Sequence, residues 1–301
     1  MFLLAAVCGI GVGMLSGLLG IGGGVVMVPL FRLAFGMGPL AATATSLFTI
    51  IPTSLSGMAK HVRDNTAIVR VGVLCGIAGA CLSPVGVMAA SASPGWMVMA
   101  AAASVIAYSS FTMLRKALKA PKAPKASAAG SPAPARAQEG AGSSSRGVGA
   151  SVAESGGASA SSGCVERPAA SWKADLTPSF VAKVALIGVV AGFLSGYVGV
   201  GGGFIMVPLF MSLLGVPMRK ASGTSLLAVC ILAVPGALQQ AFLGNIDYVV
   251  GIATAVGSIP GAFIGASLVK KVPERALRFA FAAFLMAVAV ILVLNESGVA
   301  A

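Results

Sequence analysis

Apolar residues gather along this chain into eight long runs, each bounded by charged residues or by Gly, Pro and Asn turn signals. The runs occupy residues 2–35, 40–59, 71–90, 96–114, 180–215, 221–243, 248–269 and 276–294. Six of them have the length of about 20 residues that a membrane-spanning helix needs. The pattern predicts an all-α integral membrane protein.

The first and fifth runs are too long for a single crossing, at 34 and 36 residues. As straight helices they would extend about 50 Å, whereas the hydrocarbon core is about 30 Å thick. A glycine cluster interrupts each run, at 20–24 and 199–203, and each glycine costs a helix about 1 kcal/mol relative to alanine. Each long run is therefore predicted to be a helix–break–helix hairpin. The first run has no basic n-region, so we expect it to belong to the fold and not to a cleaved signal peptide.

The two parts of the chain repeat each other. Residues 13–31 read GMLSGLLGIGGGVVMVPLF and residues 192–210 read GFLSGYVGVGGGFIMVPLF, with 13 of 19 positions identical at an offset of 179. Internal duplication of this kind is typical of secondary transporters. Between the copies, residues 115–178 are rich in Ala, Ser, Gly and Pro, a composition that cannot bury enough apolar area to offset its ordering entropy. We predict a first membrane repeat at 1–114, a disordered basic linker at 115–178 and a second membrane repeat at 179–301.

Charge indicates how the repeats are oriented. The chain is 57% hydrophobic and 9% charged, and of its 20 Lys and Arg residues nine lie between 115 and 173 while the others flank apolar runs. Such basic residues fit membrane flanks better than a nucleic-acid surface. Basic clusters follow the second and fourth runs of the first repeat, but in the second repeat they follow the fifth and seventh runs. This exchange of sides predicts two inverted repeats in the plasma membrane, with the linker cytoplasmic and both termini outside.

The glycine clusters belong to a repeated motif, SGxxGxGGGxxxxP, at 16–29 and 195–208. Unwound backbone at membrane depth is tolerated where it lines a cavity or is covered by protein, and the N–H groups of a half-helix starting there suit an anion. The Thr-Ser pairs that follow could add hydroxyl donors. The candidate substrate-binding residues are Ser16, Gly20, Gly22, Gly23, Gly24, Thr45, Ser46, Ser195, Gly199, Gly201, Gly202, Gly203, Thr224 and Ser225.

Other interpretations of these residues stay open. The glycines alone would also allow close helix crossing, whereas a P-loop is disfavoured because no Gly-Lys-Ser/Thr follows. His61 is expected in an interfacial loop, and Gln239 and Gln240 in helix–helix contacts or at the substrate. No run carries a central Asp or Glu, and the cysteines have no metal or disulfide spacing. An enzyme, a metal site and a cofactor are therefore not expected.

The doubled glycine motif, the Thr-Ser pairs and the sequence Gly244-Asn-Ile-Asp247 resemble the TauE/SafE family of sulfite exporters over nearly the whole chain outside 115–178. The resemblance implies a permease that exports sulfite or a related small organosulfur anion. The inverted repeats with paired glycine breaks predict that it works by alternating access. An importer or channel for another small anion, and a non-transporting membrane scaffold, remain as alternatives. The expected partners are the anion and the lipid bilayer, with a homo-oligomer possible and nucleic acid excluded.

Overall fold

The computed structural model describes residues 2–119 and 178–296, and these residues form ten α-helices and no strand. The helices of the first repeat are α1 (Phe2–Leu19), α2 (Gly24–Phe35), α3 (Pro39–Arg63), α4 (Val69–Ala92) and α5 (Gly95–Lys119). Those of the second repeat are α6 (Pro178–Val198), α7 (Gly203–Leu213), α8 (Met218–Phe242), α9 (Tyr248–Leu268) and α10 (Glu274–Glu296). The all-α prediction is confirmed, and each over-long run is divided into two helices.

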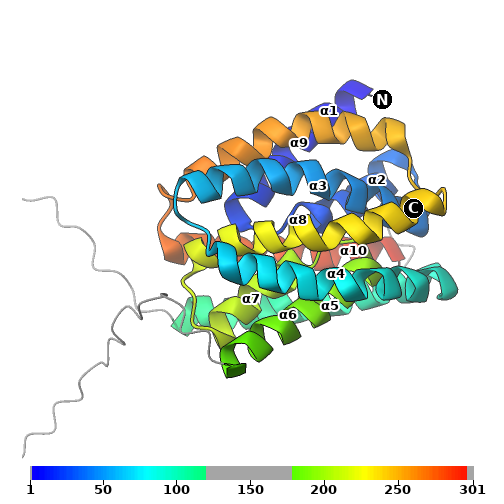
Figure 1. Cartoon of the computed structure of the whole chain (residues 1–301). Helices are drawn as coiled ribbons and strands as arrows, with labels where there is room; N and C mark the ends of the chain where they lie inside the picture. Colours follow the sequence, from blue (N-terminus) through cyan, green and yellow to red (C-terminus); the bar gives the residue numbers. More distant parts are fainter. Residues whose placement is uncertain (1, 120–177, 297–301) are drawn as a thin grey trace, which may run out of the picture. The chain divides into compact units, whose positions relative to one another are not determined.

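Six helices, α1, α4, α5, α6, α8 and α9, are long and apolar enough to cross a membrane. The equivalent helices α3 and α8 lie inside the bundle, where they pack against each other and against α9 and α4 respectively (Figure 1). Six hydroxyl side chains of α3 are buried there and hydrogen bonded, which places this face of the helix inside the protein and away from lipid. The chain is therefore an integral membrane protein with two central helices.

The two repeats are packed into each other. The first helix of each repeat lies along the fourth helix of the other, because α1 packs on α9 and α6 packs on α4. Glycines allow this close approach: a Cβ on Gly13 would overlap the backbone of Ser258, and one on Gly192 would overlap the backbone of Gly79. These contacts mean that neither repeat buries its first helix alone.

The direction of the central pair follows from its contacts. Gly57, late in α3, lies beside Leu226, early in α8, with 3.1 Å between a Cβ built on the glycine and Cδ1 of the leucine. Gly236, late in α8, lies beside Leu47, early in α3, at 3.6 Å by the same measure. The two equivalent helices therefore run antiparallel.

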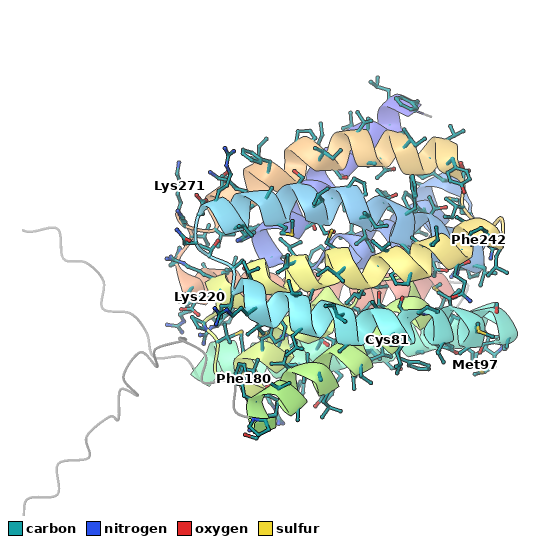
Figure 2. All side chains as sticks on the ribbon, viewed as in Figure 1. Cys81, Met97, Phe180, Lys220, Phe242 and Lys271 are labelled. Atoms are coloured by element: carbon teal, nitrogen blue, oxygen red, sulfur yellow. The ribbon has the colours of Figure 1, made fainter. Side chains whose placement is uncertain are left out.

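One end of the bundle, which we call the basic end, carries Lys220 and Lys271, whereas Met97 and Phe242 mark the opposite end (Figure 2). At the basic end Asp64 forms ion pairs with Lys270 at 3.2 Å and with Lys60 at 3.5 Å. Desolvation acts to raise the pKa of Asp64, but the two ammonium groups hold it below its usual value. The α3–α4 turn is thereby tied to the end of α9.

Most of the predicted linker lies outside the described residues, so its predicted disorder stays a prediction. Its first residues belong to α5, which continues to Lys119, and its last predicted residue, Pro178, begins α6. Lys and Arg side chains near an apolar run mark where the membrane ends, but they do not end a helix.

Candidate functional site

The breaks between α1 and α2 and between α6 and α7 each contain three glycines with left-handed backbone. The φ angles are 76°, 80° and 84° at Gly20, Gly22 and Gly23, and 73°, 83° and 65° at Gly199, Gly201 and Gly202. L side chains rarely adopt this conformation, so the sequence needs glycine at these positions. Each break is one residue shorter than predicted, because Gly24 and Gly203 are already the first residues of α2 and α7.

The two breaks lie against each other. A Cβ built on Gly24 would be 2.6 Å from the carbonyl carbon of Val200, and one built on Gly203 would be 2.6 Å from the carbonyl oxygen of Ile21. The first residue of each half-helix thus contacts the break of the opposite repeat. We call the place where the two breaks touch the crossing. Since the N-terminus of a helix carries a partial positive charge, the partial charges of α2 and α7 converge there.

Each break contains polar groups that the protein itself leaves without partners. No side chain caps the start of α2 or α7. Backbone carbonyls of the breaks accept from some of the first N–H groups: that of Val26 donates to Gly23, and those of Gly203 and Ile205 donate to Gly201 and Gly202 respectively. Ser16 and Ser195 are buried, and neither Oγ has a hydrogen-bond partner. The Ser16 Oγ lies 3.5 Å from the position that a Cβ on Gly23 would occupy, which places this hydroxyl at the start of α2. Buried hydroxyls without partners are rare and suit a site that a polar ligand completes.

The serines of the Thr-Ser pairs bind the breaks of the opposite repeat. Ser225 Oγ donates to the carbonyl oxygen of Gly20 at 2.6 Å, and Ser46 Oγ donates to that of Gly199. Their protons are therefore directed at backbone carbonyls in this conformation. The predicted role of these two serines as donors to a substrate stays a prediction.

The threonines of the same pairs hold loops of the opposite repeat. Thr45 Oγ1 accepts from the backbone N–H of Asp247 at 3.0 Å, and Thr224 Oγ1 accepts from that of Ile68 at 2.9 Å. Asp247 in turn caps α9, which explains the Asp of the Gly244–Asp247 sequence. The Thr-Ser pairs thus join the repeats reciprocally.

Two apolar side chains that sequence reasoning missed fill the crossing. Cδ1 of Ile50 is 2.5 Å from a Cβ built on Gly24 and 2.9 Å from one built on Gly201, and Cγ1 of Val229 is 2.7 Å from one built on Gly22. Both side chains are fully buried. An apolar residue within an apolar run carries no signal of its own, although the offset of 179 identifies these two as equivalent.

The expectation that His61 lies in an interfacial loop is wrong. His61 is buried in the last turn of α3, where Nε2 donates to the carbonyl oxygen of Gly17 at 3.0 Å and Nδ1 lies 2.8 Å from Thr66 Oγ1. Neighbouring charges suggested a loop, but α3 continues past them. Gln240, its equivalent in the second repeat, accepts a hydrogen bond from the side chain of Asn245 at 2.8 Å, which favours a structural role.

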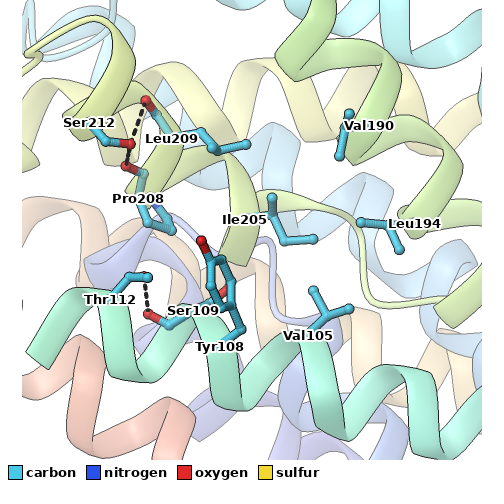
Figure 3. Close-up of a pocket in the computed structure, with 10 residues that line it drawn as sticks. All are labelled: Val105, Tyr108, Ser109, Thr112, Val190, Leu194, Ile205, Pro208, Leu209 and Ser212. Atoms are coloured by element: carbon cyan, nitrogen blue, oxygen red, sulfur yellow. Dashed lines mark hydrogen bonds between the residues drawn. The ribbon is translucent and has the colours of Figure 1, made fainter.

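A groove of about 340 Å³ lies beside the second half-helix, between α5, α6 and α7 (Figure 3). Leu194, Ile205 and Pro208 form part of its apolar lining, and the exposed side chain of Tyr108 lies across it. Leu194 directly precedes the unpartnered Ser195. Unfilled space thus borders both helices that flank the second break.

Paired broken helices that meet inside a helical bundle are the arrangement in which secondary transporters bind their substrates. The chain belongs to the sulfite exporter TauE/SafE family, whose sequence profile matches residues 5–292. It is a membrane transporter of that family.

Relatives of similar length have the same description. The chain is 26% identical over 269 residues to the probable membrane transporter protein YdhB of Bacillus subtilis, a match that covers 89% of this chain and 90% of that one. It is 24% identical over 292 residues to YunE of the same organism, covering 92% and 91%. The sulfite exporter TauE/SafE family protein 3 of Arabidopsis thaliana is 31% identical over 105 residues, which cover 33% of this chain and 21% of that one. No solved structure matches the chain significantly.

Proposed function

We propose that this transporter moves sulfite or a related small organosulfur anion out of the cell. The observation that carries the proposal is the convergence of the uncapped N-termini of α2 and α7, each beside the opposite break. Two partial positive charges and N–H donors in a protein-covered place favour an anion over a cation or a neutral solute. The family's name supplies the anion: sulfite carries its charge on oxygens that accept such hydrogen bonds.

Alternating access between inverted repeats is the proposed mechanism. The antiparallel course of the equivalent helices α3 and α8 supports inversion, and the reciprocal packing of the repeats gives them a shared surface on which to rock. We place the basic end on the cytoplasmic side of the plasma membrane, since Lys and Arg favour that side. By the same rule, the basic composition of residues 115–178 favours a cytoplasmic linker. No enzymatic step is part of this mechanism.

The membrane potential gives the direction. An interior-negative potential favours the exit of an anion by about 2.3 kcal/mol per charge per 100 mV. The potential alone is therefore sufficient to drive export, and the proposed mechanism requires no coupling ion.

Flux measured in proteoliposomes of the purified chain tests the proposal. We expect an imposed potential, negative on the side of the basic end, to drive sulfite and small sulfonates out of that side faster than from protein-free liposomes. Flux that is selective for an unrelated anion, or equal in both directions under opposite potentials, would indicate the importer or channel, whereas flux independent of the potential would contradict potential-driven export. No flux of any anion, together with a partner captured by the isolated linker, would indicate the scaffold.

A further inference from the structure

The space between the two breaks is filled by the chain itself. Ile50 and Val229 come from the central helices α3 and α8, are equivalent in the two repeats and have no exposed surface. Ile50 reaches both breaks, because its Cδ1 is 2.5 Å from a Cβ built on Gly24 and 2.9 Å from one built on Gly201. Val229 likewise lies 2.7 Å from a Cβ built on Gly22 and 3.4 Å from one on Gly201. These two side chains fit here because Gly22, Gly24 and Gly201 have no Cβ atom.

Their place on the helices couples them to the breaks. Ile50 follows Ser46 by four residues and Val229 follows Ser225 by four, so each apolar side chain lies on the same helix face as a serine that binds a break carbonyl. A movement of α3 or α8 that releases the serine from the carbonyl also withdraws the apolar side chain from the crossing.

An anion and this apolar pair cannot occupy the crossing together. An anion needs the N–H groups at the starts of α2 and α7, whereas branched hydrocarbon against those groups provides no acceptor. The buried, unpartnered Ser16 and Ser195 hydroxyls show that polar groups of the breaks are unsatisfied in this closed arrangement.

We propose that Ile50 and Val229 form an apolar gate between the two helix breaks and set the size of the anion that passes. This inference rests on the proposed function. The gate opens when the two side chains move away from the breaks. The space left between them then decides how large an organosulfur anion can be and still reach the N-termini of α2 and α7. The gate differs between the repeats by one methylene group, since one member is Ile and the other Val.

The test compares the flux of sulfite with that of benzenesulfonate, a bulkier anion with the same sulfur–oxygen chemistry, in proteoliposomes of the full chain. We expect Ile50→Ala and Val229→Ala to raise the benzenesulfonate-to-sulfite flux ratio about tenfold, the usual discrimination for small changes in an apolar pocket. Ile77→Ala, on a side chain that is 55% exposed on α4, is the matched control and should leave the ratio unchanged.

Ile50→Val removes only one methylene group, so it tests the gate even if the alanine variants do not fold. It should raise the ratio by a smaller factor while thermal unfolding in detergent stays close to that of the unchanged chain. Folded variants that transport sulfite with an unaltered ratio would overturn the gate and leave the proposed function intact. An unchanged chain that carries neither anion would overturn both.

Discussion

Gly23 offers a test that separates an anion site from simple helix packing. Its φ of 84° means that Gly23→Ala must hold a side chain in left-handed backbone, which costs about 1–2 kcal/mol. The added Cβ meets little else, since its nearest neighbours are the flexible end of Met27 at 3.2 Å and the Ser16 side chain at 3.5 Å. The expected loss of stability is therefore mainly the cost of left-handed backbone, with a small displacement of the Met27 methyl group added.

Gly36→Ala supplies the matched control. Gly36 has a φ of 62°, and a Cβ there would meet no atom within 4 Å, so its cost is also about 1–2 kcal/mol. The two variants should thus unfold at similar temperatures in detergent. Gly36 is exposed and Gly23 is buried. For function, the difference is that only the methyl group at Gly23 would stand between the Ser16 hydroxyl and an anion at the start of α2.

The functional loss at Gly23 can be estimated. One hydrogen bond to a charged group is worth about 1.5–3 kcal/mol, which corresponds to an affinity loss of roughly 10- to 100-fold. We expect the sulfite concentration for half-maximal flux to rise by this factor in Gly23→Ala and to change little in Gly36→Ala. Equal flux changes in both variants, in proportion to their unfolding temperatures, would refute the site and leave packing as the role of the glycines.

Further predictions concern topology, the linker and the contacts between repeats. Reporters fused at Ala301 and near Gly149 should lie outside and inside the cell respectively; a cytoplasmic Ala301 would contradict inversion. Replacing 125–168 by a short Gly/Ser segment should preserve membrane insertion and a monodisperse detergent peak, and loss of either would indicate structure in the linker. Ser225→Ala should cost about 1–3 kcal/mol of stability, because the buried Gly20 carbonyl loses its donor; an unfolding temperature equal to that of the unchanged chain would refute this.

The sequence predicts the features of this fold that depend on local composition. Apolar runs of spanning length, glycine clusters that no helix tolerates and a repeat at constant offset all leave direct marks in the chain. The breaks were therefore located to within one residue, at Gly24 and Gly203. Helix ends were less accurate, because α3 and α5 continue beyond the apolar stretches that predicted them.

The contacts between the repeats could not be predicted in the same way. Ser46 and Ser225 were recognised as candidate donors, but their partners belong to the other repeat and are more than 150 residues away. The sequence did not indicate a role for Ile50 and Val229, because they are ordinary apolar residues within apolar runs. Their position matters only because they pack against glycines of the breaks, which have no Cβ. His61 was misplaced because its charged neighbours resemble a loop.

Sulfite flux through Gly23→Leu, compared with the unchanged chain, tests the central claim most directly. The leucine side chain would lie in the first break, next to the Ser16 hydroxyl. Leucine at the equivalent Gly202 is less suitable, because its Cβ would lie 2.8 Å from the carbonyl oxygen of Ala191. An anion site at the crossing predicts that Gly23→Leu inserts into the membrane, still unfolds cooperatively in detergent and carries no sulfite. Sulfite flux equal to that of the unchanged chain would contradict the account.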